Sequence, residues 1–332
     1  MKKKIKIISL TIIAILLLCV FCEISGAFRS RESKIVEISK GSGISIISGN
    51  LKENKVIGSK FLFMVYSKIT NQTYYPGVHK FNSKSYLNVA KELSKPAKPE
   101  TVMVTIPEGY EQREIAQLLE EKGVITAKEF NNAAKLEKFD YWFLKDIKKR
   151  KMELEGYLFP DTYEFSFDES ADSIIRKMLD NFESKFTSDM KKRANKLGLS
   201  VDELITMASV VEREAASKDE LSLVAGVFYN RLDESRESVG LLQSCATVQY
   251  ILEKRKPVLS LKDTKIKSPY NTYINKGLPI GPIASPGLNC INAALYPEDT
   301  DYLYFCADGS GRHYFAKTAN GHQENMKKAG LM

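Results

Sequence analysis

The first half of the sequence contains an internal repeat, and this repeat restricts the possible folds more than any other feature. Six positions recur after 68 residues. Each copy has the pattern of a short strand, a glycine turn, an amphipathic helix and a Val-Ile segment that is a strand or an extended link. The pattern predicts two small βα units between Val36 and about Phe143. The recurring residues are Ile38, Gly41, Ile47, Leu51, Val56 and Ile57, which return as Ile106, Gly109, Ile115, Leu119, Val124 and Ile125.

Small βα units of this kind serve as binding or spacer modules. Their layout resembles LysM-like modules, and this resemblance implies binding of glycans that contain N-acetylglucosamine. A packing or positioning module without a ligand is the alternative that the residues leave open.

The N-terminal segment is apolar and follows a basic cluster. Four of the first six residues are lysine, and the run from Ile7 to Cys22 carries no charge. This run is slightly shorter than the roughly 20 residues of a spanning helix, and a signal peptide cleaved after Ala27 is the alternative. Both interpretations place the remainder outside the cytoplasm. We favour an uncleaved single-pass anchor with its lysines inside.

Net charge and cysteine usage exclude several classes of protein. The net charge is +8, but the lysines are scattered and no zinc-finger spacing, RNP motif or basic helix with a heptad partner occurs. An acidic polymer or an anionic membrane suits this charge equally well, and a solvated basic surface is the interpretation that we favour. Beyond the apolar segment, Cys245, Cys290 and Cys306 are widely spaced, and with three histidines they form no metal-ligand pattern. We therefore expect no nucleic-acid partner, no metal and no cofactor.

The stretch from Ser200 to Ala216 is the strongest helix signal in the second half. Ser200 and Glu203 have capping-box spacing. Glu212 lies on the flank of the apolar stripe, where a raised pKa and a general acid can arise. Glu214 lies about 200° further round, where a surface ion pair with Lys218 explains it. The stripe that should face a core contains Leu204, Met207, Ala208, Val211 and Ala215.

The other segments of the second half predict a mainly helical domain with one hairpin. The basic stretch from Lys145 to Lys151 reads as a solvated turn, and the aromatic residues between Tyr157 and Phe165 as core residues or sugar-stacking faces. Residues 268–287 are rich in Pro, Gly, Asn and Tyr, so we expect a long irregular loop lining a functional cleft. Helices are predicted over 172–186, 190–197, 217–232, 289–295 and 322–328, and a hairpin over 302–315.

Six separated segments, in this order along the chain, resemble the endolytic murein transglycosylase family (MltG, YceG-like). The match extends from about Val36 to the C-terminus. The segments are Leu154-Glu-Gly-Tyr-Leu-Phe-Pro-Asp-Thr-Tyr163, Met207-Ala-Ser-Val-Val-Glu-Arg-Glu214, Val227-Phe-Tyr-Asn-Arg-Leu232, Pro269-Tyr-Asn-Thr-Tyr273, Gly277-Leu-Pro-Ile-Gly-Pro-Ile-Ala-Ser-Pro-Gly287 and Tyr302-Leu-Tyr-Phe-Cys-Ala-Asp-Gly309.

This resemblance implies a bacterial inner-membrane protein with a single-pass anchor and an extracytoplasmic catalytic domain. Such an enzyme cleaves nascent peptidoglycan strands between MurNAc and GlcNAc, leaves 1,6-anhydroMurNAc ends and terminates strand elongation. Peptidoglycan synthases of the elongation machinery are then possible partners. The family's catalytic glutamate falls on Glu212. Where the family usually has Asp-Pro, this chain has Cys245-Ala246, so a carboxylate role at Cys245 is in doubt.

A lytic transglycosylase needs one carboxylate, whereas hydrolytic glycosidases generally need two. We expect Glu212 to act first as acid and then as base. Gln243, Asn230, Tyr270 and Asn271 are candidates to hold sugar hydroxyl and acetamido groups, and structural hydrogen bonding of the loops is the alternative for each. The alternative functions are a non-catalytic, membrane-tethered glycan-binding scaffold and a hydrolytic muramidase.

The predicted fold class is α+β. We expect a cytoplasmic tail and membrane helix in residues 1–30, a repeated βα, LysM-like region in 31–145, and a YceG-like catalytic domain in 146–332. The last should be a mainly helical, lytic-transglycosylase-like domain with β-hairpins.

Overall fold

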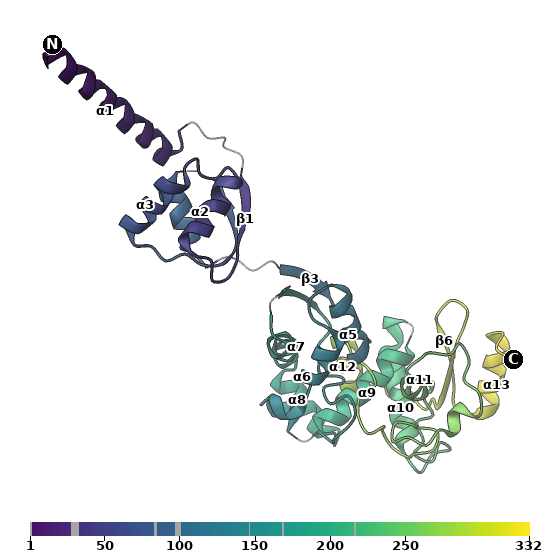
Figure 1. Ribbon diagram of the computed structural model, residues 1–332. Coiled ribbons are helices and arrows are strands. Elements are labelled where there is room, and N and C mark those ends of the chain that lie inside the picture. Colours follow the sequence, from purple (N-terminus) through teal and green to yellow (C-terminus); the bar gives the residue numbers. More distant parts are fainter. Residues whose placement is uncertain are drawn as a thin grey trace. The chain divides into compact units, whose positions relative to one another are not determined.

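The computed structural model describes residues 2–27, 33–82, 85–96, 101–145, 147–167, 169–215 and 217–332. These residues form a mixed α+β structure of 13 α-helices and three two-stranded antiparallel sheets, which confirms the predicted class (Figure 1). The chain divides into two compact units, Met1–Glu100 and Thr101–Met332.

The first unit contains one copy of the repeat. Strand β1 pairs antiparallel with β2, with Val36 opposite His79, and helices α2 and α3 come between the two strands in the chain. Its core is apolar and aromatic, with Phe63 in an edge contact with Tyr86. The elements are α1 (Lys2–Ser25), β1 (Lys34–Ile38), α2 (Ile44–Glu53), α3 (Lys60–Thr70), β2 (Gly77–Phe81) and α4 (Tyr86–Leu93).

Helix α1 is tied to the rest of the first unit by Glu23. Its carboxylate accepts hydrogen bonds from the backbone N–H groups of Gly58 and Ser59 at 2.9 and 2.8 Å, and from the Tyr86 hydroxyl at 2.6 Å. Gly58 and Ser59 lie at the N-terminal end of α3, where free N–H groups favour a carboxylate. Within the described residues, no helix combines the length and the apolar character of a membrane span.

The second copy of the repeat has the same local structure as the first. Gly41 and Gly109 both adopt left-handed conformations, with φ of +82° and +77°, and the paired positions Leu51 and Leu119 are both fully buried. The internal repeat is therefore confirmed, with the Val-Ile segments as links rather than strands. The elements of the second copy and its extension are β3 (Thr101–Thr105), α5 (Gln112–Glu121), α6 (Ala127–Ala133), the 3₁₀ turns η1 (Leu136–Lys138) and η2 (Trp142–Leu144), and β4 (Thr162–Ser166).

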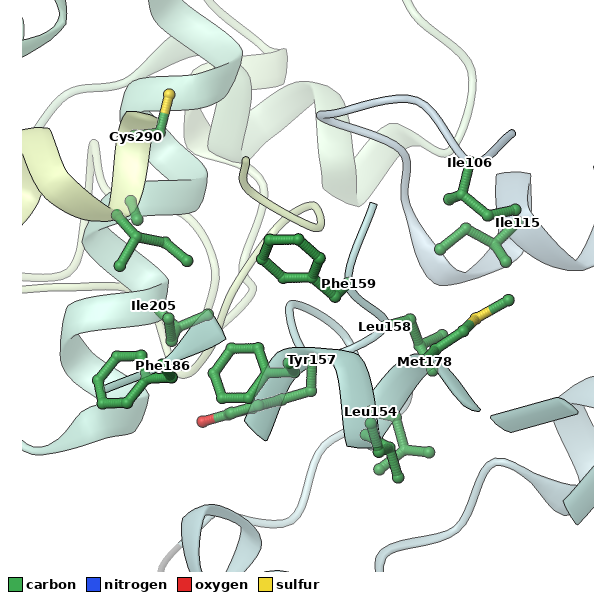
Figure 2. Close-up of a cluster of buried hydrophobic side chains, with 14 of the residues drawn as sticks. Ile106, Ile115, Leu154, Tyr157, Leu158, Phe159, Met178, Phe186, Ile205 and Cys290 are labelled. Atoms are coloured by element: carbon green, nitrogen blue, oxygen red, sulfur yellow. The ribbon is translucent and has the colours of Figure 1, made fainter. Parts of the chain in front are cut away.

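The second copy is built into the core of the second unit. Strand β3 pairs with β4, with Val104 opposite Tyr163. Figure 2 shows Ile106 and Ile115 in the same buried cluster as Tyr157 and Ile205. The units therefore separate at Glu100, whereas the predicted boundary is at 145/146. Residue 146 and the predicted boundary at 30/31 lie outside the described residues.

The remainder of the second unit is mainly helical, as predicted. The helices predicted over 172–186, 190–197, 289–295 and 322–328 all form, and β5 pairs with β6 as the predicted hairpin. Ser217 accepts from Asp219 N rather than forming a capping box with Glu220, so a 3₁₀ turn precedes the next helix. The elements are α7 (Ala171–Lys185), α8 (Ser188–Lys196), α9 (Val201–Glu214), η3 (Lys218–Glu220), α10 (Leu221–Leu232), α11 (Cys245–Leu252), η4 (Asp263–Lys265), α12 (Leu288–Leu295), β5 (Tyr304–Ala307), β6 (His313–Ala316) and α13 (Ala319–Lys328).

Helix α9 lies at the centre of this unit. Ser200 and Glu203 form the predicted capping box, with the Glu203 backbone N–H donating to Ser200 Oγ at 3.2 Å. Every residue from Leu204 to Val211 is buried, so the helix is enclosed on all sides rather than along one stripe. The reason is that α8, α10, α11 and α12 all pack against it. Its end at Glu214 precedes the predicted end at Ala216, which lies outside the described residues.

The predicted long loop is irregular, as expected, and its second half is an interior strap. Residues 281–287 are all buried. The backbone N–H of Ile283 donates to Ser209 Oγ on α9 at 3.0 Å. On its other side, Ser285 exchanges backbone hydrogen bonds with Gly109 and Tyr110, both at 2.8 Å. The strap therefore lies between α9, the helix that carries Glu212, and the glycine turn of the second repeat copy.

Candidate functional site

Glu212 lies near the end of α9, where the buried helix reaches the edge of the core. Its side chain is half-buried, and Glu212 Oε2 accepts a hydrogen bond from the backbone N–H of Gly287 at 2.9 Å. Because Gly287 ends the strap, the loop itself holds one carboxylate oxygen of Glu212. The same residue is at the N-cap of α12, so this N–H comes from a helix N-terminus.

The glycine turn of the second repeat copy lies against the other side of Glu212. A Cβ atom placed on Gly109 would lie 3.4 Å from Glu212 Cγ and 3.9 Å from Oε1. Arg213 secures the turn, because its Nη1 donates to the Gly109 carbonyl at 2.8 Å. A residue of the repeat thus shapes the surroundings of the predicted catalytic acid.

Two neighbours of Glu212 were not anticipated by the sequence analysis. Cys290 is buried on α12, and burial first, then the neighbouring Glu212 charge, raises the pKa of its thiol. The Glu108 side chain lies against Gly287, where an added Cβ would meet its carboxylate. Lys218 Nζ is 3.8 Å from Glu108. Glu108 stands in the glycine-turn segment Pro107-Glu108-Gly109, and only the fold brings this segment beside α9.

An open hollow of about 370 Å³ lies over α12 and the start of α10, next to this cluster. Lys218 connects the two, since it lines the hollow and approaches Glu108. Amides, a hydroxyl and an aromatic ring are the groups that commonly hold sugars. The lining residues are Lys218, Leu221, Ser222, Asn289, Asn292, Ala293 and Tyr296.

Glu214 has a structural role that differs from the predicted surface ion pair. Its Oε1 accepts from Ser244 Oγ at 2.6 Å and from the Ala246 backbone N–H at 3.0 Å. Lys218 approaches Glu108 instead. Glu214 therefore provides the anionic group at the N-terminus of α11, next to Cys245. A proline in place of Ala246 would have no N–H to donate.

Gln243 is exposed beside Glu214, on the wall of a cavity of about 320 Å³. Its backbone is left-handed, with φ of +53°, and its N–H donates to the Thr272 carbonyl at 3.1 Å. The side chain therefore faces open space while the backbone is held. The walls of this cavity are formed by Glu214, Phe228, Arg231, Gln243, Ser244, Cys245, Tyr273, Tyr304, Phe305 and His322.

Asn230 and Asn271 hold loops in place. Asn230 Nδ2 donates to the carbonyls of Thr300 and Tyr302 at 2.6 and 3.0 Å. Asn271 is fully buried, and its Nδ2 donates to the carbonyls of Thr264 and Ile266 at 3.0 and 2.8 Å. Of the two alternatives stated for these residues, loop hydrogen bonding is the one visible in the structure.

Tyr270 lines a different pocket from Gln243, together with Tyr250 and Arg150. Arg150 was expected in a solvated turn, but its side chain is fully buried and its Nη1 lies 3.0 Å from Asp202 Oδ2 on α9. The expectation was wrong because the guanidinium pairs with Asp202, a partly buried carboxylate on α9. The aromatic residues between Tyr157 and Phe165 are buried and fill the core.

Comparisons with known proteins show a family that covers most of the chain. The model of the YceG-like family matches residues 36–328. The chain is 36% identical over 319 residues to the endolytic murein transglycosylase of Bacillus subtilis, with 90% of this chain and 85% of that protein covered. It is 34% identical over 334 residues to the enzyme of the same name from Streptococcus pneumoniae, of which it covers 58%. A crystal structure of a yceG-like protein from Listeria monocytogenes superimposes with a TM-score of 0.60 at 34% identity, covering 89% of this chain and 99% of that one.

Proposed function

The chain belongs to the YceG-like family, and on that premise we propose that it is an endolytic murein transglycosylase with Glu212 as its catalytic acid and base. The relatives that carry this name span most of the chain. The observation that best supports the role of Glu212 is its position at the end of a buried helix, with one carboxylate oxygen held by Gly287 and space left beside the other by Gly109.

In the proposed reaction, Glu212 donates its proton to the glycosidic oxygen that links MurNAc to GlcNAc. The bond to the MurNAc anomeric carbon breaks, and the GlcNAc hydroxyl leaves. The C6 hydroxyl of the same MurNAc then attacks the anomeric carbon and returns its proton to Glu212. No water is consumed, so one carboxylate can perform both proton transfers. The product is a 1,6-anhydroMurNAc end.

The glycan strand would approach Glu212 from the hollow lined by Asn289, Asn292 and Tyr296. Two side-chain amides can bond sugar hydroxyl or acetamido groups, and an exposed tyrosine offers a face for a sugar ring. Gln243, on the cavity beyond Glu214, is a further proposed contact for the strand.

The substitution Glu212→Gln tests this assignment because it preserves shape and removes the transferable proton. We expect digests of murein by the variant to lose anhydromuramyl products, measured by mass spectrometry of muropeptides. Exposed Glu121→Gln is the matched control and should behave as wild type. Anhydromuramyl products at wild-type rates from Glu212→Gln would refute the assignment.

A hydrolytic muramidase is the second candidate, and Glu108 is the observation that favours it. The reaction with water needs a second carboxylate, and Glu108 covers the same Gly287 that binds Glu212. Glu108→Gln should then remove activity, and the products would carry reducing ends. For a transglycosylase, we expect anhydro ends from the wild type and retained cleavage in Glu108→Gln.

Membrane anchoring and an extracytoplasmic location are also part of the proposal. They rest on the basic N-terminus and the uncharged run from Ile7 to Cys22. The βααβ order of the first unit supports a LysM-like module that binds glycan, and synthases that supply nascent strands are proposed partners. Extraction of membranes with alkaline carbonate tests the anchor: the full chain should stay in the pellet, and release into the supernatant would contradict it.

A further inference from the structure

The second unit contains a pocket of about 340 Å³ between the chain before Glu155, the end of α11 and the start of the long loop. We name it the Tyr270 pocket. The transglycosylase reaction described above makes no use of it. Its walls combine aromatic and apolar side chains with several cations, and are formed by Arg113, Lys149, Arg150, Lys151, Met152, Glu155, Tyr250, Ile251, Glu253, Ser268, Pro269, Tyr270 and Ile280.

Two buried polar atoms on the walls have no hydrogen-bond partner among the described residues. One is the Tyr270 hydroxyl and the other is Arg150 Nε. Both residues are more than nine-tenths buried, with exposed fractions of 9% and 7%. Leaving a buried donor unpaired is unfavourable, so such groups normally have partners. These two donors belong to residues that line the same pocket, which favours an acceptor as its ligand.

The charges on the walls favour an anion as this acceptor. Four cations contribute, at positions 113, 149, 150 and 151, against the carboxylates of Glu155 and Glu253. Glu253 is paired with Lys151 at 2.7 Å, and Arg150 is paired with Asp202. Lys149 has no ion-pair partner in the described part of the chain and is exposed at the pocket. A cation is thus available for a ligand.

The remaining walls limit the shape of the ligand. Met152, Ile251, Pro269 and Ile280 give it an apolar lining, and the Tyr250 and Tyr270 rings meet at 4.9 Å between centroids. A small body with apolar groups, carrying one carboxylate, would satisfy the unpaired donors and the apolar walls together.

We propose that the Tyr270 pocket binds the carboxylate of a small, partly apolar ligand, and that the terminal alanyl carboxylate of a murein peptide stem is its source. The identity of the source rests on the proposed function, because murein strands carry such stems. The binding itself rests only on the pocket. The enzyme would then recognise the peptide as well as the glycan of its substrate.

A chain of charged contacts leads from the pocket to the helix of Glu212. Arg113 on the pocket wall contacts Glu111, and Glu111 lies 3.7 Å from Arg213 Nη2. Arg213 in turn holds the Gly109 turn that lies against Glu212. A carboxylate near Arg113 would compete with Glu111 for this guanidinium. A ligand in the pocket would thereby change the contacts that hold the Gly109 turn against Glu212.

The protonation state of Glu155 should make binding to the Tyr270 pocket depend on pH. It is fully buried, and burial raises its pKa to about 8. The groups that face it are Glu111, Arg150, the Tyr250 hydroxyl and the Gln112 backbone N–H. Below pH 8 the protonated Glu155 does not repel a carboxylate, whereas above pH 8 its negative charge does. Affinity should therefore fall as pH rises through about 8.

Titration of the full chain in its Glu212→Gln form with N-acetyl-D-alanyl-D-alanine, followed by calorimetry, tests the proposal without any catalysis. We expect saturable binding, and roughly tenfold weaker binding of the C-terminal amide of the same dipeptide. Tyr270→Phe should weaken binding of the acid by about tenfold and Lys149→Gln by severalfold. Tyr314→Phe, at an exposed position on β6, is the matched control and should bind as the parent does.

Three results would overturn the proposal. Absence of saturable binding would remove the site, and so would equal affinity for the acid and the amide. Acetate binding as tightly as the dipeptide would keep a carboxylate site but refute the peptide stem as its source. None of these results depends on whether Glu212 is the catalytic residue. A Glu155→Gln variant that retained the loss of affinity above pH 8 would overturn the role of Glu155.

Discussion

Glu212 and Glu214 are two residues apart on α9, and their side chains have different partners because they leave the helix in different directions. Glu212 meets the strap at Gly287, whereas Glu214 binds the N-terminus of α11 through Ser244 and Ala246. Periodicity distinguished the two directions. It could not identify the partner of either residue, since both partners come from segments more than 25 residues away in the chain.

Protonation of Glu155 should make the stability of the second unit depend on pH. Burial raises its pKa from 4.5 to about 8, so between these values the folded state binds more protons than the unfolded state. The free energy of unfolding should therefore fall as pH rises from about 5 to 8. Glu155→Gln should lessen this fall most clearly between pH 7 and 8, because Glu111, with a pKa of about 7, contributes at lower pH. Urea denaturation at pH 5, 7 and 8 measures the free energy of unfolding of both proteins. The same change of this free energy with pH in the wild type and in Glu155→Gln would contradict the role given to Glu155.

The ion pair between Arg150 and Asp202 should contribute strongly to stability. Asp202 accepts from Arg150 Nη1 at 3.0 Å and from the Tyr157 hydroxyl at 2.9 Å. Asp202→Asn leaves a buried guanidinium without its counter-charge, and we expect a loss of about 3 kcal/mol in the free energy of unfolding.

Asp189→Asn is the control for this prediction. Asp189 forms an ion pair with Lys192 at 3.0 Å, but both side chains are largely exposed. Its loss should change stability by less than about 0.5 kcal/mol. Similar losses for the two variants in denaturant titrations would show that Asp202 does not act through a buried ion pair.

At the scale of elements, the site is an assembly of one helix, one loop and one turn. Helix α9 supplies Glu212, the strap 281–287 supplies the Gly287 N–H, and the turn of the second repeat copy supplies Gly109. The strap lies in the interior because its backbone groups find partners on α9 and on the turn. A loop that lines a site is here also part of the core.

The two repeat glycines provide a matched pair for testing this assembly. Both have positive φ, so Gly41→Ala and Gly109→Ala should each cost about 1 kcal/mol in stability. A Cβ at position 41 would meet no atom within 4 Å, but at 109 it would come into van der Waals contact with the Glu212 side chain. We expect only Gly109→Ala to slow the release of anhydromuramyl products, by about tenfold. Equal rates for the two variants would mean that the turn does not position Glu212.

At the scale of the whole molecule, the two repeat copies have been used in different ways. The first has its own core around Phe63 and Tyr86. The second shares a core with α9, the helix that carries Glu212, through Ile106, Ile115 and Leu119. One sequence pattern thus serves once as a separate module and once as part of a larger fold.

Truncation tests this division directly. A protein of residues 101–332 should unfold cooperatively, because its core lies entirely within it. A protein of residues 146–332 should fail to fold, since it lacks β3, the partner of β4, and the buried face of α5. Circular dichroism recorded during heating compares the thermal unfolding of the two truncated proteins. A cooperative transition in 146–332 would contradict the shared core.

The sequence by itself determined the local structure and the family. Capping residues, glycines and apolar spacing are local signals, and they predicted the repeat, α9, the hairpin and Glu212 on the flank of its helix. The tertiary structure alone decided which segments meet. It placed the second repeat copy in the core with α9, enclosed α9 on all sides, moved Arg150 inward, and set Gly109, Gly287 and Glu108 around Glu212. These outcomes depend on contacts between distant segments, which local spacing does not encode.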